Sequence, residues 1–400
     1  MRIGYLYNLH AYPPKGGNHT HVLELVRGFL QQGHEVAVID DPTMPEVSNF
    51  PGDTGESVEA FLEFCDVIYV RIDSRPLGSW EHLKRAMAGA KDKTPVVWEI
   101  NSPADENLAF SWLGGRKAGT RESWLRWLKR WLHAARQKPA IIREEKVRRA
   151  LAKRVDAAVC VSSSMANYAK TYLGIEHSVA VPNGGPLISE GEIRSRRQRR
   201  INDRFTVFYS GSAIYPWQGL DMLTRVIELA KIDAPDIRFL LAVNQKTGSL
   251  PEGANVEIKE RIPRDEVLNE ICRADACIAL HPDWSWTPHG VHGSPTKLWE
   301  YMSCMTPVVT SNRGQMAELI EHGRNGLLTS DEPSEILSRI ITLRDNPELA
   351  KTIGRNGWEL VQEKLNWTVV SRETLSIFHQ SIQHRVAAPN SDVRCSVQRT

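Results

Sequence analysis

Short apolar runs alternate along this chain with segments whose apolar positions recur at helical spacing. Five runs in the first half predict buried parallel strands, at residues 3–7, 35–40, 66–72, 95–100 and 157–163. Between the first two, residues 19–34 form an amphipathic helical pattern that ends at Gly33. A strand, a helix and a further strand in this order predict a doubly wound α/β domain.

The same alternation returns in the second half of the chain. Five more strands are expected at residues 205–211, 237–244, 256–260, 276–282 and 307–311, with helices from about Gly219 and over 295–305. This pattern predicts a second α/β domain. Residues 181–189 suit a hinge, and the run from Arg194 to Arg200 is interpreted as a solvated linker, with an anion site there as the lesser alternative.

Composition adds limits to this picture. A chain of 400 residues suggests two or three domains, and 41% hydrophobic with 24% charged residues is typical of a globular enzyme. No apolar run is long enough for a transmembrane helix, and the first residues lack signal-peptide architecture. Six cysteines without a metal-type or redox-type spacing favour a reducing, cytoplasmic compartment.

The charge is concentrated in one segment. Residues 116–154 hold fourteen Lys and Arg against three Glu, a net +11, so the rest of the chain carries −9 against a total of +2. An acidic body with one strongly basic segment indicates a local anionic partner.

The helix expected at 295–305 carries the strongest chemical signal. Ser294 suits its N-cap and Pro295 its first position. Lys297 in the first turn opposes the helix dipole unless an anion binds there. Glu300 lies one turn from Thr296, where its carboxylate can accept hydrogen bonds from a sugar's vicinal hydroxyls. Phosphate and ribose together predict a nucleotide, although an ordinary capped helix with a solvated lysine fits equally well.

Three other strand-to-turn-to-helix junctions are candidate binding sites, and a plain turn is the alternative at the first of them, Gly16 and Gly17. In open α/β sheets, ligands bind at the carboxyl ends of strands, so these junctions are expected to face a cleft between the two domains. The candidate residues are Gly16 and Gly17 after the first strand, Ser212 and Gln218 after residues 205–211, and Gly314, Gln315 and Glu318 after residues 307–311.

These motifs occur in a characteristic order. They are GGNHTHVLELVRGFLQQGHEV, VVWEIN, VSSSM, VPNGG, YSG followed by WQGLD, GSPTKLWEYMSCMTPVV and GQMAELIEHGRNGLL. Over roughly residues 1–380 the chain resembles a retaining GT-B glycosyltransferase of family 4, also called glycosyl transferases group 1. The resemblance implies two Rossmann-like domains: 1–185 on the acceptor side, with a helix at about 366–384 packing back on it, and 200–365 binding the nucleotide sugar. Residues 385–400 are expected to be disordered.

The resemblance also implies roles for individual residues. Glu300 would bind the ribose, and the diphosphate would be held by Gly293, Ser294, Pro295, Thr296 and Lys297. Gly16 and Gly17 would border the donor from the other domain. No metal ion or other cofactor is expected, because cations and helix N-termini can stabilise the leaving diphosphate.

Four positions depart from the commonest family pattern. The usual glutamate eight residues before Glu300 is His292, and the usual mid-domain histidine is Asn101. Two family cations are replaced by Ser212 and Gln218. His292 is expected either to hydrogen-bond the donor sugar or to be a surface loop histidine, and Asn101 would orient a hydroxyl group. The departures are interpreted as those of a variant enzyme.

Residues 121–136 predict an amphipathic helix within the basic segment. Its apolar face carries Trp124, Trp127 and Trp131 with interleaved leucines, and Arg126, Lys129 and Arg130 lie beside or opposite it. Tryptophan on one face and cations on the other are typical of a helix that lies in an anionic membrane surface. The alternative is a helix whose tryptophans pack on the protein core.

The leading hypothesis is a glycosyltransferase on the inner face of the cytoplasmic membrane, with no nucleic-acid partner, that builds a lipid-linked or cell-surface glycan. A non-catalytic nucleotide-sugar-binding subunit of a glycan-assembly complex is the alternative, because two cations are missing. An NAD-dependent dehydrogenase is disfavoured, since no G-x-G-x-x-G opens the first helix.

Overall fold

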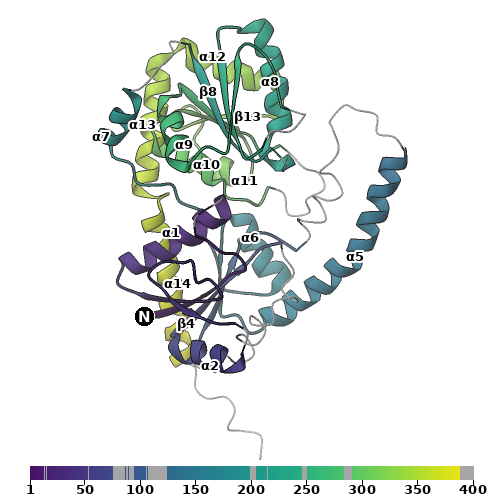
Figure 1. Ribbon diagram of the computed structural model, residues 1–400, viewed down its shortest axis with the longest axis vertical. Coiled ribbons are helices and arrows are strands. Elements are labelled where there is room, and N and C mark those ends of the chain that lie inside the picture. The colour runs from purple at the N-terminus through teal and green to yellow at the C-terminus, as the bar shows by residue number, and fades with distance from the viewer. Residues whose placement is uncertain are drawn as a thin grey trace, which may run out of the picture. The chain divides into compact units, whose positions relative to one another are not determined.

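The computed structural model describes residues 1–12, 14, 16–52, 54–74, 86, 89, 94–104, 106, 124–198, 204–213, 215–245, 250–282 and 291–387. They form two compact units (Figure 1). Unit 1 consists of Met1–Ala104, Ile142–Val181 and the chain from Ser371, and unit 2 consists of Asp105–Ile141 and Pro182–Val370. Part of the stretch expected in the first domain, Asp105–Ile141, therefore groups with unit 2.

A parallel sheet of seven strands forms the centre of unit 1. Its spatial order is β3 (Ser48–Phe50), β2 (Glu35–Ile39), β1 (Arg2–Leu6), β4 (Val67–Ile72), β5 (Val96–Ile100), β6 (Ala157–Cys160) and β7 (Ser178–Ala180). The five predicted strands are confirmed, and the two short edge strands β3 and β7 were not predicted. The strand order reverses direction between β1 and β4, which creates a topological switch point.

Helices cover both faces of this sheet. They are α1 (Gly17–Gln31), α2 (Gly55–Phe64), α6 (Ser163–Asn167) with the turn Tyr168–Leu173, and α14 (Trp367–Ala387). Phe378 of α14 packs against the ring of Tyr69 with centroids 4.9 Å apart and against Phe29 of α1 at 5.7 Å.

The last helix is longer than expected. Arg385 lies within α14 and pairs with Asp156 at 2.6 Å, so residues 385–387 are helical rather than part of a disordered tail. Residues 388–400 of that expected tail lie outside the described residues.

A second parallel sheet, of six strands, forms the centre of unit 2. Its order is β10 (Val256–Glu260), β9 (Arg238–Val243), β8 (Thr206–Gly211), β11 (Ala276–Ala279), β12 (Val308–Ser311) and β13 (Leu327–Thr329). The predicted strands of the second half are confirmed. The order reverses here between β8 and β11, which is the second switch point.

Alternate strand residues face two cores in unit 2, as the period of a strand requires. Val207 and Tyr209 of β8 face the helices α8 (Leu220–Asp233) and α12 (Pro333–Asp345), whereas Phe208 faces the opposite core. That core is closed by α9 (Arg264–Arg273), α10 (Thr296–Ser303) and α13 (Pro347–Glu363) (Figure 1).

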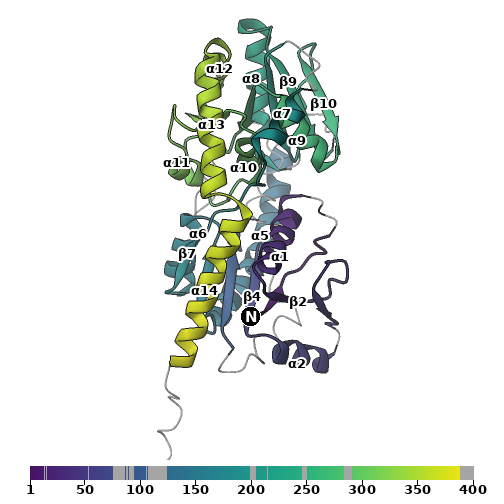
Figure 2. The same cartoon turned by 90° about the vertical axis from the view of Figure 1, so that its left-hand side faces the viewer.

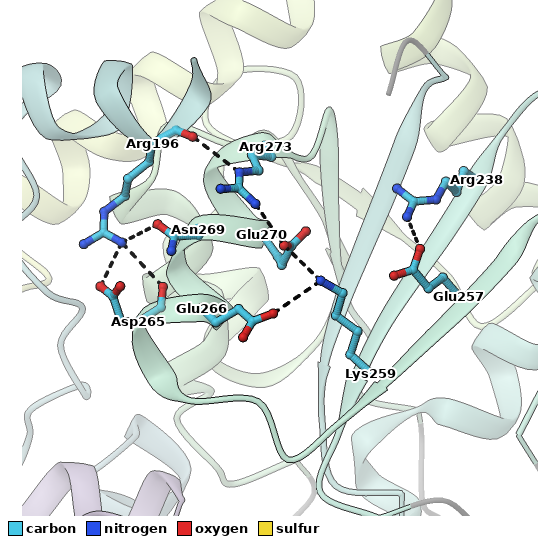
Figure 3. A network of polar contacts seen from close by, with 9 residues as sticks. All are labelled: Arg196, Arg238, Glu257, Lys259, Asp265, Glu266, Asn269, Glu270 and Arg273. Carbon is cyan, nitrogen blue, oxygen red and sulfur yellow. Dashed lines mark hydrogen bonds and ion pairs between the residues drawn. The ribbon is translucent and has the colours of Figure 1, made fainter. Parts of the chain in front are cut away.

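The arginine-rich stretch after the hinge is not a solvated linker over its described part. It forms α7 (Glu190–Arg197), in which Ser189 caps the N-terminus and Arg196 pairs with Asp265 of α9 at 2.9 Å. Figure 3 shows that Arg196 and Arg273 belong to a network of ion pairs and hydrogen bonds over α7, α9 and β10. The prediction failed because charge density alone does not reveal partners elsewhere in the chain.

Arg197, the last residue of α7, contacts the ends of two other helices. Its guanidinium donates hydrogen bonds to the carbonyls of Cys272 at 3.1 Å, Cys304 at 3.1 Å and Met305 at 2.8 Å. These carbonyls terminate α9 and α10, where helices have acceptors without intrahelical partners. One side chain therefore fastens α7 to two helix ends.

The basic segment forms the long helix α5 (Trp124–Ala152), which continues well beyond the expected residue 136 and contains Pro139 (Figures 1 and 2). Its C-terminal half is fixed by Arg148, which is buried, pairs with Glu144 at 3.3 Å and donates to the carbonyl of Ser102 at 3.2 Å. Within the described part of the chain, no helix meets the length and hydropathy needed to cross a membrane.

Candidate functional site

The carboxyl ends of β8 and β11 lie on either side of the switch point in unit 2. β8 ends at Gly211, and β11 runs into the buried residue His281. Parallel strands that diverge in this way leave a crevice at their carboxyl ends, which is where open α/β sheets bind ligands. The first turn of α10 contributes Lys297 to the same region.

Lys297 is a buried residue, 9% exposed. Among the described residues it has no charged partner, and its Nζ atom makes no hydrogen bond with them. The ammonium lies 4.6 Å from the centre of the Tyr209 ring. Burial lowers the pKa of Lys297 to about 7. A bound anion would stabilise the charged form of this buried lysine, because the anion replaces the interactions that water makes with an exposed ammonium group.

His281 is a second buried group of this kind, and sequence reasoning missed it. Its Nε2 atom has no hydrogen-bond partner among the described residues. Burial, together with the nearby Lys297, lowers the pKa of His281 to about 3, so the imidazole is neutral. The available signal was its position directly after an apolar strand run, where polar residues often contact ligands.

Three polar groups lie close to Gly211, the last residue of β8. A Cβ atom at this position would lie 2.8 Å from Oε1 of Gln218, 2.8 Å from the Tyr209 hydroxyl and 3.0 Å from Nζ of Lys297. Gln218 closes the short turn Pro216–Gln218, and Ser212 follows Gly211 directly. The structure thus places the side chains of Gln218 and Lys297 at the same strand end.

The start of α10 differs from the sequence interpretation. Pro295 is the N-cap and the helix begins at Thr296. Ser294 does not cap the helix: its Oγ accepts a hydrogen bond from the backbone N–H of Asn183 at 2.8 Å, and its carbonyl accepts one from the Asn183 side chain at 2.9 Å. The hinge residue Asn183 was not predicted to hold this turn, because its sequence position lies far away.

Glu300 has a cationic partner in the structure. Nη2 of Arg264, the first residue of α9, lies 3.3 Å from Oε1 of Glu300. The Glu300 side chain is 18% exposed. Sequence reasoning missed Arg264, since nothing near it marks it as a partner of α10. The pair fixes one carboxylate oxygen.

His292 is a buried residue rather than a surface loop histidine. It is 8% exposed, and its Nε2 atom lies 3.3 Å from Oε1 of Glu106. Glu106 follows β5 in sequence and was assigned no role from the sequence alone. The two belong to the same compact unit although 186 positions separate them.

The junction after β12 supports the segment that carries His292. Gly314 begins the short helix α11 (Gly314–Leu319) with φ +51°, and a Cβ there would lie 2.6 Å from the carbonyl oxygen of Val291. Gln315 is buried and Glu318 is exposed. Gly314 therefore permits close packing of backbone beside His292.

Unit 1 holds a buried polar cluster around Glu99 on β5. The carboxylate accepts hydrogen bonds from Tyr5, from Arg71 of β4 and, at 2.5 Å, from the side-chain amide of Asn101. Nε2 of His21 on α1 lies 2.8 Å away. Burial alone would raise the pKa of Glu99, but Arg71 and His21 hold that pKa well below its usual range. Asn101 is thus fixed by its neighbour in the strand.

Gly16 and Gly17 lie at the start of α1, the helix that carries His21. Gly16 is the N-cap of α1, and a Cβ atom there would meet nothing within 4 Å. No three His, Cys, Asp or Glu side chains lie together as metal ligands in the part of the chain that the structure describes.

The N-terminal part of α5 exposes large apolar side chains. Trp124 is 69% and Trp131 44% exposed, and Leu125 and Leu132 are also exposed. The alternative in which the tryptophans pack on a core therefore fails for these two residues. Lys129 is exposed as well, whereas the side chains of Trp127, Arg126 and Arg130 lie outside the described residues.

Comparison with known families identifies two matching models. The model of Glycosyltransferase Family 4 matches residues 15–187, and that of Glycosyl transferases group 1 matches residues 204–346. The two matches follow one another along the chain and correspond to its two sheets.

Solved structures share the fold over nearly the whole chain. Sucrose-phosphate synthase from Thermosynechococcus elongatus has a TM-score of 0.67 at 16% identity, covering 96% of this chain and 99% of that one. Anabaena HepE in complex with UDP-glucose has a TM-score of 0.66 at 17% identity, covering 95% and 100%.

Curated relatives align over shorter stretches. The phosphatidyl-myo-inositol mannosyltransferase of Propionibacterium freudenreichii is 28% identical over 159 residues, 40% of this chain and 39% of that protein. Across the matching curated relatives, the chain spans between 19% and 60% of their length.

Proposed function

Because this chain belongs to the family 4, group 1 glycosyltransferases with the GT-B fold, we propose that it transfers a sugar from a nucleotide-diphosphate sugar to a glycan or lipid-linked acceptor. The proposed transfer retains the anomeric configuration, needs no metal ion, takes place at the membrane surface and serves the synthesis of a cell-surface polysaccharide or glycoconjugate.

The observation that carries the proposal is the pair of buried, unpartnered groups at the switch point of unit 2. Lys297 and His281 both lack hydrogen-bond partners for their terminal nitrogens among the described residues. The diphosphate is the anionic part of such a donor, and it would convert Lys297 to its charged form. Gln218 and the backbone at Gly211 would donate further hydrogen bonds.

Glu300 is the proposed ribose partner. Its carboxylate lies one turn along α10 from Thr296, and Arg264 fixes one of its oxygens at 3.3 Å. The vicinal ribose hydroxyls would then donate to this carboxylate. The complex of HepE with UDP-glucose supports a nucleotide sugar as the donor.

The leaving diphosphate has a defined role in the proposed step. As the bond between the anomeric carbon and the phosphate oxygen breaks, negative charge grows on that oxygen, and Lys297 stabilises it. The acceptor oxygen forms the new bond to the anomeric carbon, and its proton passes to the leaving phosphate oxygen. No strong protein base is required, which fits the presence of Asn101 where the family commonly has histidine.

The acceptor is proposed to be lipid-linked because α5 suits a membrane surface. Exposed Trp124 and Trp131 can enter the region between headgroups and acyl chains, and the net charge of +11 over 116–154 attracts anionic lipid. The match to a phosphatidyl-myo-inositol mannosyltransferase also supports a lipid acceptor. We place the protein on the cytoplasmic face of the membrane.

The test is donor turnover. Purified protein is incubated with UDP- and GDP-sugars and a membrane lipid extract, and release of free nucleoside diphosphate is measured. One donor should turn over in a lipid-dependent way, and Lys297→Met should abolish turnover. Binding of a nucleotide sugar without turnover under all these conditions would instead support a non-catalytic subunit, which Ser212 in place of a family cation favours.

A further inference from the structure

The first residue of α9 contacts the proposed ribose partner on α10. Nη2 of Arg264 lies 3.3 Å from Oε1 of Glu300. This contact fixes one carboxylate oxygen and leaves the other for the ribose hydroxyls. The contact depends on where the first turn of α9 lies relative to α10. Whatever holds that turn therefore also sets the position of the carboxylate.

The C-terminal ends of α9 and α10 are fastened to each other. The guanidinium of Arg197 donates to the carbonyls of Cys272 and Cys304, both at 3.1 Å. The Thr306 hydroxyl donates to the carbonyl of Ile271 at 2.8 Å. A helix of 10 residues is about 15 Å long, so a tilt of about 10° around its fastened end would move its start by about 2 to 3 Å. Such a shift would break the contact at the other end of the helix.

Arg196 on α7 holds the beginning of α9 (Figure 3). Its Nη1 atom lies 2.9 Å from Oδ1 of Asp265 and donates to Oδ1 of Asn269 at 2.6 Å. Asp265 directly follows Arg264 in the first turn of α9, and Asn269 lies one turn further along. Because Arg196 and Arg197 are neighbours in sequence, α7 holds α9 at both of its ends.

A second cation supports the same helix from the sheet. Nζ of Lys259 on β10 lies 3.4 Å from Oε1 of Glu266 and 3.2 Å from Oε1 of Glu270, and both glutamates belong to α9 (Figure 3). Lys259 thus fixes α9 against β10, whereas Arg196 fixes it against α7. Contacts on two sides restrict the tilt that would take Arg264 away from α10.

We propose that Arg196 is a positioning residue for recognition of the donor ribose. By holding the first turns of α9, it keeps Arg264 in contact with Glu300, and the second carboxylate oxygen stays available to the ribose hydroxyls. The arginine-rich stretch after the hinge thus takes part in ligand recognition without contacting the ligand. This inference rests on the proposed function, since it needs a nucleotide as ligand.

The experiment measures the contribution of ribose to binding. Whichever of UDP and GDP binds more tightly is titrated calorimetrically beside its 2′,3′-dideoxy form, and the ratio of the two affinities is compared between variants. Arg196→Gln should lower this ratio about threefold, the effect of losing partly exposed charged contacts. Asp265→Asn removes the same ion pair by a milder change and should lower the ratio as well. Affinity for the dideoxy form should stay unchanged in both variants.

Two further variants separate positioning from a general structural role. Arg196→Gln combined with Arg264→Gln should lower the ratio no more than Arg264→Gln alone, because Arg196 acts through Arg264. Arg355→Gln is the matched control, since Arg355 pairs with Glu190 of α7 at 3.1 Å. Its loss removes an arginine–glutamate pair of α7 that does not involve α9, and it should leave the ratio unchanged.

Two results would overturn the inference. One is an unchanged ratio in Arg196→Gln, including the case in which both affinities fall equally, and the other is additive losses in the double variant. Wild-type protein that binds neither UDP nor GDP would overturn the proposed function itself. Wild-type protein that binds a nucleotide and its dideoxy form equally would overturn the ribose role of Glu300. The failures are therefore distinguishable.

Discussion

Nζ of Lys297 lies 4.6 Å from the centre of the Tyr209 ring. The aromatic face offers a weak electrostatic attraction to the ammonium, but not the hydrogen bonds that a buried charge requires. The burial of Lys297 therefore destabilises the folded protein, but it leaves the ammonium available to bind an anion.

Lys297→Met is expected to stabilise the ligand-free protein near neutral pH. The folded-state pKa of about 7 is below the ordinary value of 10.5, so the unfolded state binds the proton more tightly. The free-energy cost of protonating Lys297 in the folded state is absent above pH 10.5 and grows as the pH falls. It reaches its full value below pH 7, where the variant should be more stable by about 3 to 5 kcal/mol. Urea unfolding between pH 6.5 and 10.5 tests this. Equal stabilities across that window would contradict it, and Lys231→Met provides a more exposed control.

Affinity for UDP or GDP is expected to fall between pH 7.5 and 9. Free Lys297, with a pKa of about 7, is mostly deprotonated over this range and must take up a proton to bind, whereas the terminal phosphate, with a second pKa of about 6, stays ionised. Binding should thus take up a proton, which calorimetry in buffers of different ionisation enthalpy detects. In Lys297→Arg the guanidinium stays charged, so the pH dependence should disappear. A wild-type affinity independent of pH would argue against Lys297 as the phosphate partner.

Glu300→Gln is expected to weaken UDP or GDP binding on the order of tenfold, through loss of charged hydrogen bonds to ribose. A 2′,3′-dideoxy nucleotide should bind wild type and variant equally, because it lacks the hydroxyls. Arg264→Gln should give a smaller loss, since Arg264 only orients the carboxylate at 3.3 Å. An equal loss for the dideoxy nucleotide would show that Glu300 acts through folding rather than ribose.

Glu99→Gln is expected to destabilise unit 1 by about 3 to 5 kcal/mol at pH 7, because it leaves buried Arg71 without its anionic partner. The depressed pKa of Glu99 means that its stabilisation is present above the unfolded value near 4.3 and is lost as pH falls below it. Chemical unfolding monitored from pH 7 to pH 3 should show a gap between wild type and variant that narrows with acid. A gap that stays constant would refute this account.

Serine at both Trp124 and Trp131 is expected to release the protein from anionic vesicles, because both indoles are exposed on α5. Co-sedimentation with phosphatidylglycerol vesicles measures the bound fraction, which should also fall as salt rises. Ile232→Ser removes an apolar side chain that is 79% exposed on α8 and should have no effect. Binding equal to wild type in the double variant would end the membrane proposal.

The spacing of apolar positions along the sequence was sufficient to predict most strands of both sheets. The runs that became β1, β4 and β8 are apolar, short and bounded by turns, so local sequence defines them. The three-residue strands β3 and β7 were missed because they are too short for a pattern and depend on pairing with a neighbour.

The candidate site was predictable only where its residues lie close together in sequence. Lys297 and Glu300 share a helix, and Gln218 follows Gly211 by only seven residues, so motif reasoning reached them. Arg264 and His281 come from other elements, and only the folded sheet brings such residues to one edge. The assignment of Ser294 as N-cap failed for the same reason, since its partner Asn183 lies in the hinge.

The contacts of Arg197 restrict the stretch after the hinge that the sequence predicts to be a linker. Proteases cleave backbone that can adopt an extended conformation in their active site. The backbone at Arg197 cannot become extended while its side chain is hydrogen-bonded to the ends of α9 and α10. Trypsin resistance at this arginine thus depends on the integrity of two helices of unit 2. Insertions are expected to be poorly tolerated at such a point, because its side chain is hydrogen-bonded to two helix ends.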